Sequence, residues 1–147
     1  MNEYIVYDHP YKYQTFYTFS VQTDIKGIYA HTAQLHLAED GVLTITKGYK
    51  YDGPSGPAVD TDNFMDGSAV HDALYELGRR KLLPIKFRKN ADRMMFKINR
   101  AAGMSRRRAA WTYAGVRAGA RKSFTRHQHN FPRHRKIPSN PLVIVVH

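Results

Sequence analysis

The sequence contains no cysteine, and this absence excludes disulfide bonds and thiolate metal sites. No apolar run approaches the roughly 20 residues that a membrane-spanning helix needs. The first residues also lack the basic and then apolar pattern of a signal peptide. We therefore expect a soluble protein without a transmembrane segment or signal peptide. The absence of cysteine fits a reducing compartment.

Acidic residues are absent from the last third of the chain. After Asp92 the sequence has 13 Lys and Arg residues and no Asp or Glu, so the excess of positive charge, +11 for the whole chain, comes entirely from this part. Such asymmetry indicates an anionic partner, which is a phospholipid surface, a nucleic acid or an acidic protein. The alternative is a solvated basic face with no specific ligand.

The chain is long enough for one domain with a real core, with 147 residues of which 42% are hydrophobic. We expect a single α+β domain over residues 1–121. It would consist of a β-rich part, residues 1–47, followed by a loop and helices, residues 48–121. The remainder, residues 122–147, is basic and rich in proline and histidine, and we expect it to form an extended arm.

Short runs of β-branched and aromatic residues in the first part predict a small antiparallel sheet. A hairpin-type turn at Glu39-Asp40-Gly41 separates two of them. The expected strands lie near residues 4–7, 15–19, 31–37 and 42–45.

Apolar residues at helical spacing predict three helices in the second part. The first covers about residues 65–80, and the second covers about residues 89–102 and ends at Gly103. The third begins at a Ser105 cap and ends before Gly119. Its aromatic residues Trp111 and Tyr113 are expected in the core.

The most informative spacing is His71-Asp72-x-x-Tyr75 in the first expected helix. His71 and Tyr75 lie one turn apart and share a face, while Asp72 points to the neighbouring face. His71 could accept a proton if a carboxylate fixed its other ring nitrogen, and Asp92 and Tyr75 are candidates for that hydrogen-bonded support. The alternative is a capping histidine or one whose polar atoms are satisfied in the core.

A loop dense in glycine and proline, residues 51–57, precedes this helix. It could turn several backbone carbonyls toward one point, which is how a hard cation such as Ca²⁺ is bound, and Asp72 would add a carboxylate. The alternative is an ordinary turn.

Taken together, these motifs resemble the phospholipase A2 domain of parvovirus minor capsid proteins. That family pairs a Tyr-x-Gly-Pro-Gly calcium loop with a His-Asp-x-x-Tyr helix and a later Asp, and the similarity covers residues 48–103. The resemblance implies a phospholipase A2-like three-helix core in which His71 is the general base and Asp92 orients it. It further implies Ca²⁺ held by Asp72 and by the carbonyls of Tyr51 and Gly53.

The loop departs from that pattern at two positions. Ser55 replaces the second glycine of the family's loop, and Gly56 follows one place later. Asp52 does not belong to the pattern either, and it is a candidate extra metal ligand.

The chain also resembles a phage and bacterial family called domain of unknown function 1353, which is the closer match. It covers residues 48–119 and implies a phage or prophage source, and hence a virion or the host cytoplasm as the location, without naming an activity. The matching residues are Gly48, Tyr49, Asp52, Gly53, Ser55, Pro57, His71, Asp72, Tyr75, Ala91, Asp92, Tyr113, Val116, Arg117 and Gly119.

Basic residues interleaved with aromatic ones continue through the third helix and beyond. They suit phosphate contacts, docking on an anionic membrane, or insertion into a viral particle. No known nucleic-acid motif is present, so sequence-specific binding is not expected. The candidate anion-binding residues are Arg106, Arg107, Arg108, Arg117, Arg121 and Lys122.

Two functions of different class fit these features. The first is a calcium-dependent phospholipid esterase, favoured because one group of residues supplies base, orienting carboxylate and metal ligand together. The second is a structural component of a phage tail or head–tail junction without turnover. In that case His71, Asp72 and Asp92 would form a buried network, and the basic arm would contact partner subunits or DNA.

Overall fold

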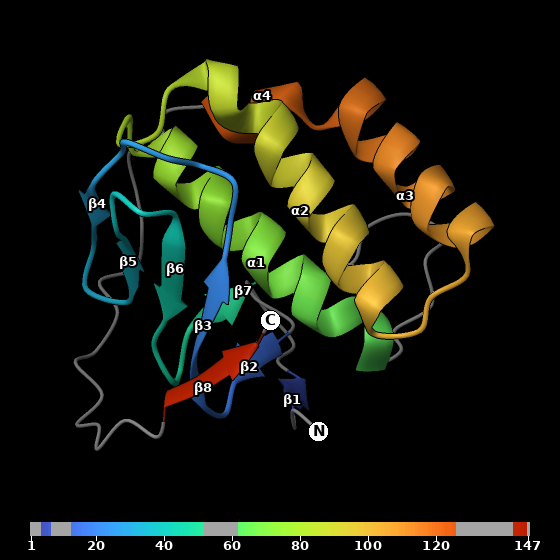
Figure 1. The fold of residues 1–147 in the computed structure, drawn as a ribbon, viewed down its shortest axis with the longest axis horizontal. Helices are drawn as coiled ribbons and strands as arrows, with labels where there is room; N and C mark the ends of the chain where they lie inside the picture. Colours follow the sequence, from blue (N-terminus) through green and yellow to red (C-terminus); the bar gives the residue numbers. More distant parts are fainter. Residues whose placement is uncertain (1–3, 7–12, 52–61, 126–142, 147) are drawn as a thin grey trace.

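The structure is a computed structural model that describes residues 4–6, 13–51, 62–125 and 143–146. Side chains are described for residues 13–51 and 67–125. Figure 1 shows strands on one side of the molecule and helices on the other, so the expected α+β class is confirmed.

The strands form two sheets rather than one. The larger sheet has the order β4-β5-β6-β3-β8, and the smaller has the order β1-β2-β7. The larger comprises β3 (Thr18–Gln22), β4 (Ala30–His31), β5 (Leu35–Leu37), β6 (Val42–Ile45) and β8 (Val143–Val146). The smaller comprises β1 (Tyr4–Val6), β2 (Tyr13–Thr15) and β7 (Lys50–Tyr51). All pairs are antiparallel except β3 with β8, which is parallel.

The predicted turn at residues 39–41 joins β5 to β6. Gly41 has a φ of 91°, a left-handed conformation that glycine adopts without steric cost. A Cβ atom at this position would also lie 2.7 Å from the backbone oxygen of Thr23. Both features make glycine the residue that fits here.

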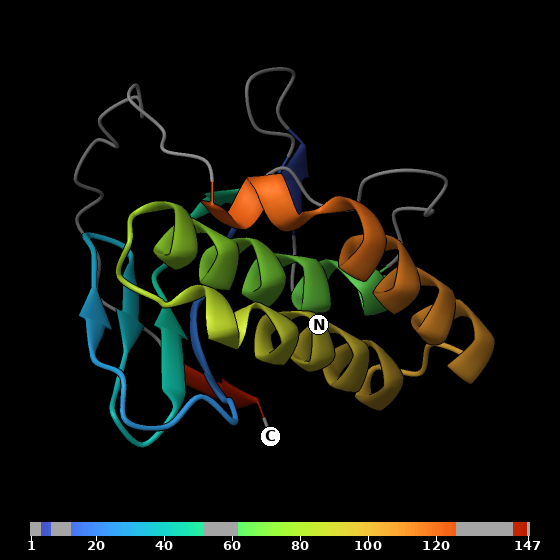
Figure 2. The same cartoon turned by 90° about the horizontal axis from the view of Figure 1, so that it is seen from above.

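Helices α1, α2 and α3 lie side by side with α2 in the middle, and a short α4 lies across the end of α1 (Figures 1 and 2). Their bounds agree with the predicted helices within a few residues, and Ser105 caps α3 as expected by accepting from the backbone N–H of Arg108. The helices are α1 (Asp62–Arg79), α2 (Arg88–Ala101), α3 (Arg106–Gly119) and α4 (Arg121–Thr125), and a 3-10 turn η1 covers Ile85–Phe87.

Helix α1 is the centre of the core because apolar residues recur along it at helical spacing. Ala69, Ala73 and Leu77 follow each other at intervals of one turn, and Val70 and Leu74 do so on the adjoining face. All five are buried in one cluster with residues of the strands and of α2. The sheet and the helices are therefore held by a common core.

The expected extended arm begins with a helix instead. Residues 122–125 belong to α4, because Phe124 anchors this turn by packing edge-on against Tyr75, with ring centroids 5.1 Å apart. Residues 126–142 lie outside the described residues, and β8 then pairs with β3 inside the same chain. Among the described residues, no helix is both long and apolar enough to cross a membrane.

Candidate functional site

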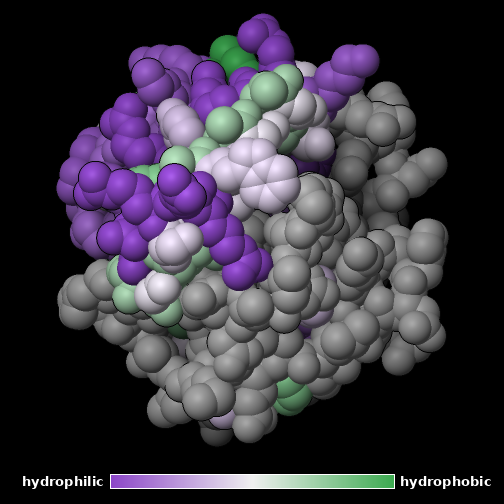
Figure 3. Space-filling view, turned by 90° about the vertical axis from the view of Figure 1, so that its right-hand side faces the viewer, coloured by the Kyte–Doolittle hydropathy of each residue, from purple (hydrophilic) through white to green (hydrophobic). Residues whose placement is uncertain are grey.

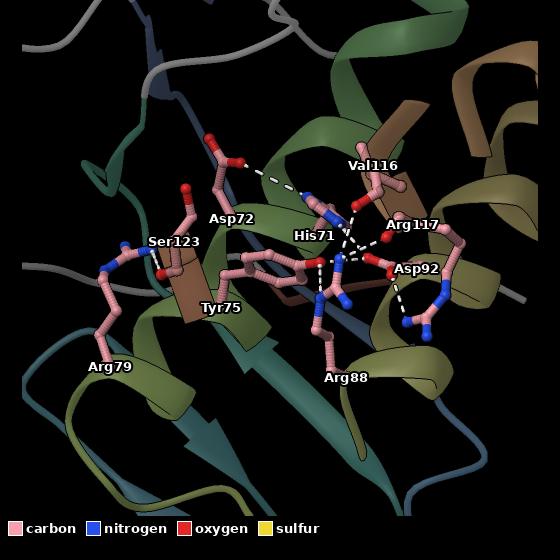
Figure 4. A network of polar contacts seen from close by, with 9 residues as sticks. All are labelled: His71, Asp72, Tyr75, Arg79, Arg88, Asp92, Val116, Arg117 and Ser123. Carbon is pink, nitrogen blue, oxygen red and sulfur yellow. Dashed lines mark hydrogen bonds and ion pairs between the residues drawn. The ribbon is translucent and has the colours of Figure 1, made fainter. Parts of the chain in front are cut away.

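A carboxylate on α2 receives two side chains from α1. Asp92 Oδ1 lies 2.7 Å from Nε2 of His71 and accepts a hydrogen bond of 2.6 Å from the hydroxyl of Tyr75 (Figure 4). His71 and Tyr75 are one helical turn apart, so their rings lie against each other with centroids 4.1 Å apart. The structure therefore brings together the three residues predicted as the catalytic group.

Asp92 is fully buried, with 0% of its surface exposed. Burial alone would raise the pKa of this carboxyl, but the hydrogen bonds from His71 and Tyr75 outweigh it and hold the pKa below its usual range. The guanidinium of Arg117, on α3, adds a contact of 2.9 Å to the second carboxylate oxygen. Asp92 is thus an ionised group at which three helices meet.

The two ring nitrogens of His71 have different surroundings: Nε2 contacts Asp92, and Nδ1 faces Asp72. Since Asp92 accepts at Nε2, the neutral ring carries its lone pair on Nδ1. Nδ1 faces Oδ1 of Asp72 at 3.8 Å, beyond hydrogen-bond distance. Burial lowers the pKa of His71, but the carboxylates of Asp72 and Asp92 outweigh it and raise the pKa above 6.5. The arrangement can orient a base, although only 6% of His71 is exposed.

Arg88 is a buried member of the site that the sequence analysis missed. Its Nε donates to the Tyr75 hydroxyl at 3.0 Å, so that hydroxyl accepts from Arg88 while donating to Asp92. Burial, followed by the contact with Asp92, raises the pKa of Tyr75 well above its ordinary value and keeps the phenol protonated. One signal could have revealed Arg88, because it precedes Asp92 by one helical turn on α2.

Arg88 also connects the site to the end of α3. Its Nη2 donates to the backbone oxygens of Val116 at 2.7 Å and of Arg117 at 3.0 Å. These carbonyls belong to the last turns of the helix, and the oxygen of Val116 also accepts from the backbone N–H of Ala120 at 3.0 Å. Arg88 therefore fixes the part of α3 from which Arg117 reaches Asp92.

The predicted metal ligands are only partly within the described residues. Asp72 lies on α1 with 26% of its side chain exposed, and Tyr51 is the last residue of β7, a strand that packs against α1. Asp52 and Gly53 lie outside the described residues. In the described part of the chain, no three His, Asp or Glu side chains form a metal-binding group. The partly exposed carboxylate of Asp72 fits a hard cation as one oxygen ligand.

The predicted anion-binding residues divide into two sets. Arg117 turns inward onto Asp92, and Arg108 is half-buried. The exposed set comprises Arg106 and Arg107 in the first turn of α3 and Arg121 and Lys122 at the start of α4.

The prediction that Trp111 belongs to the core is wrong. Its exposed fraction is 62%, because the packed side of α3 is formed by other residues such as Ala109 and the half-buried Tyr113. Trp111 lies two residues from both Ala109 and Tyr113, and residues at that separation point to different sides of a helix.

The chain matches no family model, no curated protein and no solved structure. The geometry of the site is therefore the basis for any functional assignment.

Proposed function

We propose that the protein is a phospholipase A2-like hydrolase of phospholipid esters. The observation that carries the proposal is the shared oxygen of Asp92, which holds Nε2 of His71 and the hydroxyl of Tyr75 at 2.7 and 2.6 Å. This arrangement fixes the tautomer and orientation of the ring, as a general base requires. A phage origin, suggested by the motifs of the chain, remains part of the proposal.

The chemistry follows from the ring nitrogen that Asp92 leaves available. Nδ1 of His71 would take a proton from a water molecule as that water attacks the ester carbonyl. When the ester C–O bond breaks, the imidazolium would return the proton to the departing alkoxide, leaving a fatty acid and a lysophospholipid. The charge of the imidazolium would be stabilised by Asp92, whose ionised state Arg117 supports.

Asp72, with the backbone carbonyls of Tyr51 and Gly53 and with Asp52 as a further candidate, would hold Ca²⁺. When bound, the ion would supply Lewis-acid polarisation of the ester carbonyl. Asp72 lies beside Nδ1 of His71, so base and cation would act on the same side of the ring.

The test is release of free fatty acid from mixed phospholipid vesicles, measured with Ca²⁺ and with a chelator. We expect calcium-dependent release that His71→Ala abolishes and that a matched control, His31→Ala at an exposed position of β4, retains. Absence of release from the folded wild-type protein, for every lipid tried, would refute the hydrolase.

A second candidate function is a non-catalytic virion component, in a phage tail or head–tail junction. The low exposure of His71, 6%, favours it, because a base must reach its substrate. In this case the network of His71, Tyr75, Asp92 and Arg88 would serve stability alone. Quantitative mass spectrometry of purified particles tests this candidate: a fixed copy number per particle, with no esterase activity, would support it.

A further inference from the structure

The exposed indole of Trp111 lies on a helix whose outer face meets no other described part of the protein. It is the one tryptophan of the chain, and 62% of its surface is exposed. The neighbouring outward positions Ala110, Ala114 and Gly115 are short, so the indole projects beyond them. Nothing in the described part of the chain shields this indole from water, so only a partner molecule that covers the face would bury it.

Cations flank this aromatic residue along the chain, and neither α3 nor α4 contains an acidic residue. Arg106 and Arg107 are exposed in the turn before Trp111, and Arg121 and Lys122 are exposed just beyond the end of α3. Figure 3 views the molecule from this side and shows pale and light green side chains with hydrophilic ones in purple above and to the left of them. The described part of this face therefore combines an exposed indole with exposed cations near both ends of the helix.

The position of the arginines is unfavourable for the helix itself. The N-terminal turn of a helix carries partial positive charge, and α3 has no acidic residue in its first turn. Arg106 and Arg107 therefore repel the helix dipole, whereas an anion beside them would be attracted to both. Their placement favours an external anionic partner over a purely structural role.

We propose that the outer face of α3, centred on Trp111, docks the protein on a surface of anionic phospholipid. Tryptophan prefers the interface between headgroups and acyl chains, and arginine binds lipid phosphates there. A single-stranded nucleic acid fits this face less well, because it is bound by several aromatic side chains on which successive bases stack. Here Tyr113 is half-buried, and its ring packs against Phe96 with centroids 6.2 Å apart.

Docking on this face would place lipid against the outer side of α3, the helix whose inward-turned Arg117 belongs to the candidate active site. Trp111 precedes Arg117 by six residues on the same helix, which is an axial rise of about 9 Å. The inference thus extends the proposed hydrolase, whose substrate would lie in the docked surface. Binding and hydrolysis can nevertheless be measured separately.

The single tryptophan supplies the binding assay. The full-length protein is titrated with vesicles of ether-linked phosphatidylglycerol and phosphatidylcholine, which have no ester to hydrolyse. We expect the Trp111 emission to shift to the blue and to intensify with vesicles that contain phosphatidylglycerol. We expect no change with phosphatidylcholine alone, and we expect added salt to weaken the binding.

Two matched double variants test the cations. Arg106→Gln with Arg107→Gln should weaken binding to phosphatidylglycerol vesicles about thirtyfold, since each arginine near an anionic surface contributes. Lys26→Gln with Lys47→Gln removes the same charge from exposed side chains in the β-strand part and should leave binding within about twofold. Trp111→Ala, followed by vesicle co-sedimentation, should weaken binding while circular dichroism confirms that the helices remain.

An unchanged emission with phosphatidylglycerol vesicles would overturn the docking face, as would equal binding to both lipids. A shift produced by a single-stranded oligonucleotide and not by vesicles would reassign the face to nucleic acid. His71→Ala separates this inference from the proposed function, because it should bind vesicles normally yet release no fatty acid from ester lipids. Binding without hydrolysis by the wild-type protein would refute the hydrolase and retain the docking face.

Discussion

Replacement of Arg88 by methionine removes the group that ties three elements together. The guanidinium donates one hydrogen bond to the Tyr75 hydroxyl and two to backbone oxygens at the end of α3, at distances of 2.7–3.0 Å. Methionine fills much of the same space with an unbranched side chain, so the change removes the donors more than the packing. We expect α3 to lose its attachment to α2 at that end.

The expected loss in the free energy of unfolding is about 3 kcal/mol. Hydrogen bonds from a charged donor contribute about 1.5–3 kcal/mol each, so three such bonds would give a larger sum. Two effects reduce it: a buried charge no longer has to be desolvated, and water can reach carbonyls at a helix end once the side chain is gone. The change remains well above that of an ordinary surface substitution.

Urea unfolding and amide hydrogen exchange test this expectation together. Arg88→Met should lower the unfolding midpoint and accelerate exchange in α3 more than in α1. Lys89→Met is the matched control, because Lys89 is the exposed next residue of α2, and it should stay within about 0.5 kcal/mol of the wild type. Equal stability of the two variants, with unchanged exchange in α3, would refute the structural role assigned to Arg88.

Two further predictions concern packing and pH. Gly78→Ala should destabilise the protein by about 1–3 kcal/mol, because the new Cβ would lie 2.5 Å from the Phe124 ring. Gly115→Ala has open space around the new Cβ and should instead stabilise α3 by about 0.5–1 kcal/mol. A thermal unfolding measurement in which Gly78→Ala is the more stable of the two would contradict the packing of Phe124 on α1. The lowered pKa of Asp92 stabilises the fold at pH values above the unfolded pKa of about 3.9, and this contribution is lost as the pH falls through the folded pKa. In a plot of the free energy of unfolding against pH, Asp92→Asn should therefore flatten the fall on the acid side. Asp40→Asn, in the exposed β5–β6 turn, should not.

The sequence predicts those parts of the structure that depend on local spacing. The helices follow from apolar periodicity, and the Ser105 cap follows from a local hydrogen bond. The contact of His71 and Tyr75 follows from their separation of one turn on α1. Asp92 could be named as their partner because the motif includes a later carboxylate, although spacing alone does not place α2 against α1.

Other features depend on contacts between distant parts of the chain and carry no local signal. The pairing of β8 with β3 joins segments more than 100 residues apart, and nothing in four apolar residues specifies their neighbour. The bonds of Arg88 to α3 have no local signal either, because their acceptors are backbone oxygens that every residue possesses, although its place one turn before Asp92 points to the site.

The fold places part of the excess positive charge of the sequence on one face of the molecule, around α3. Asp92 is the last acidic residue of the chain, and its oxygens already contact His71, Tyr75 and Arg117 in a fully buried position. It therefore does not neutralise the exposed cations at the start of α3 and at the start of α4. Neither α3 nor α4 contains an acid, so these helices do not balance the charge of this face themselves, and the exposed indole beside it favours an anionic partner.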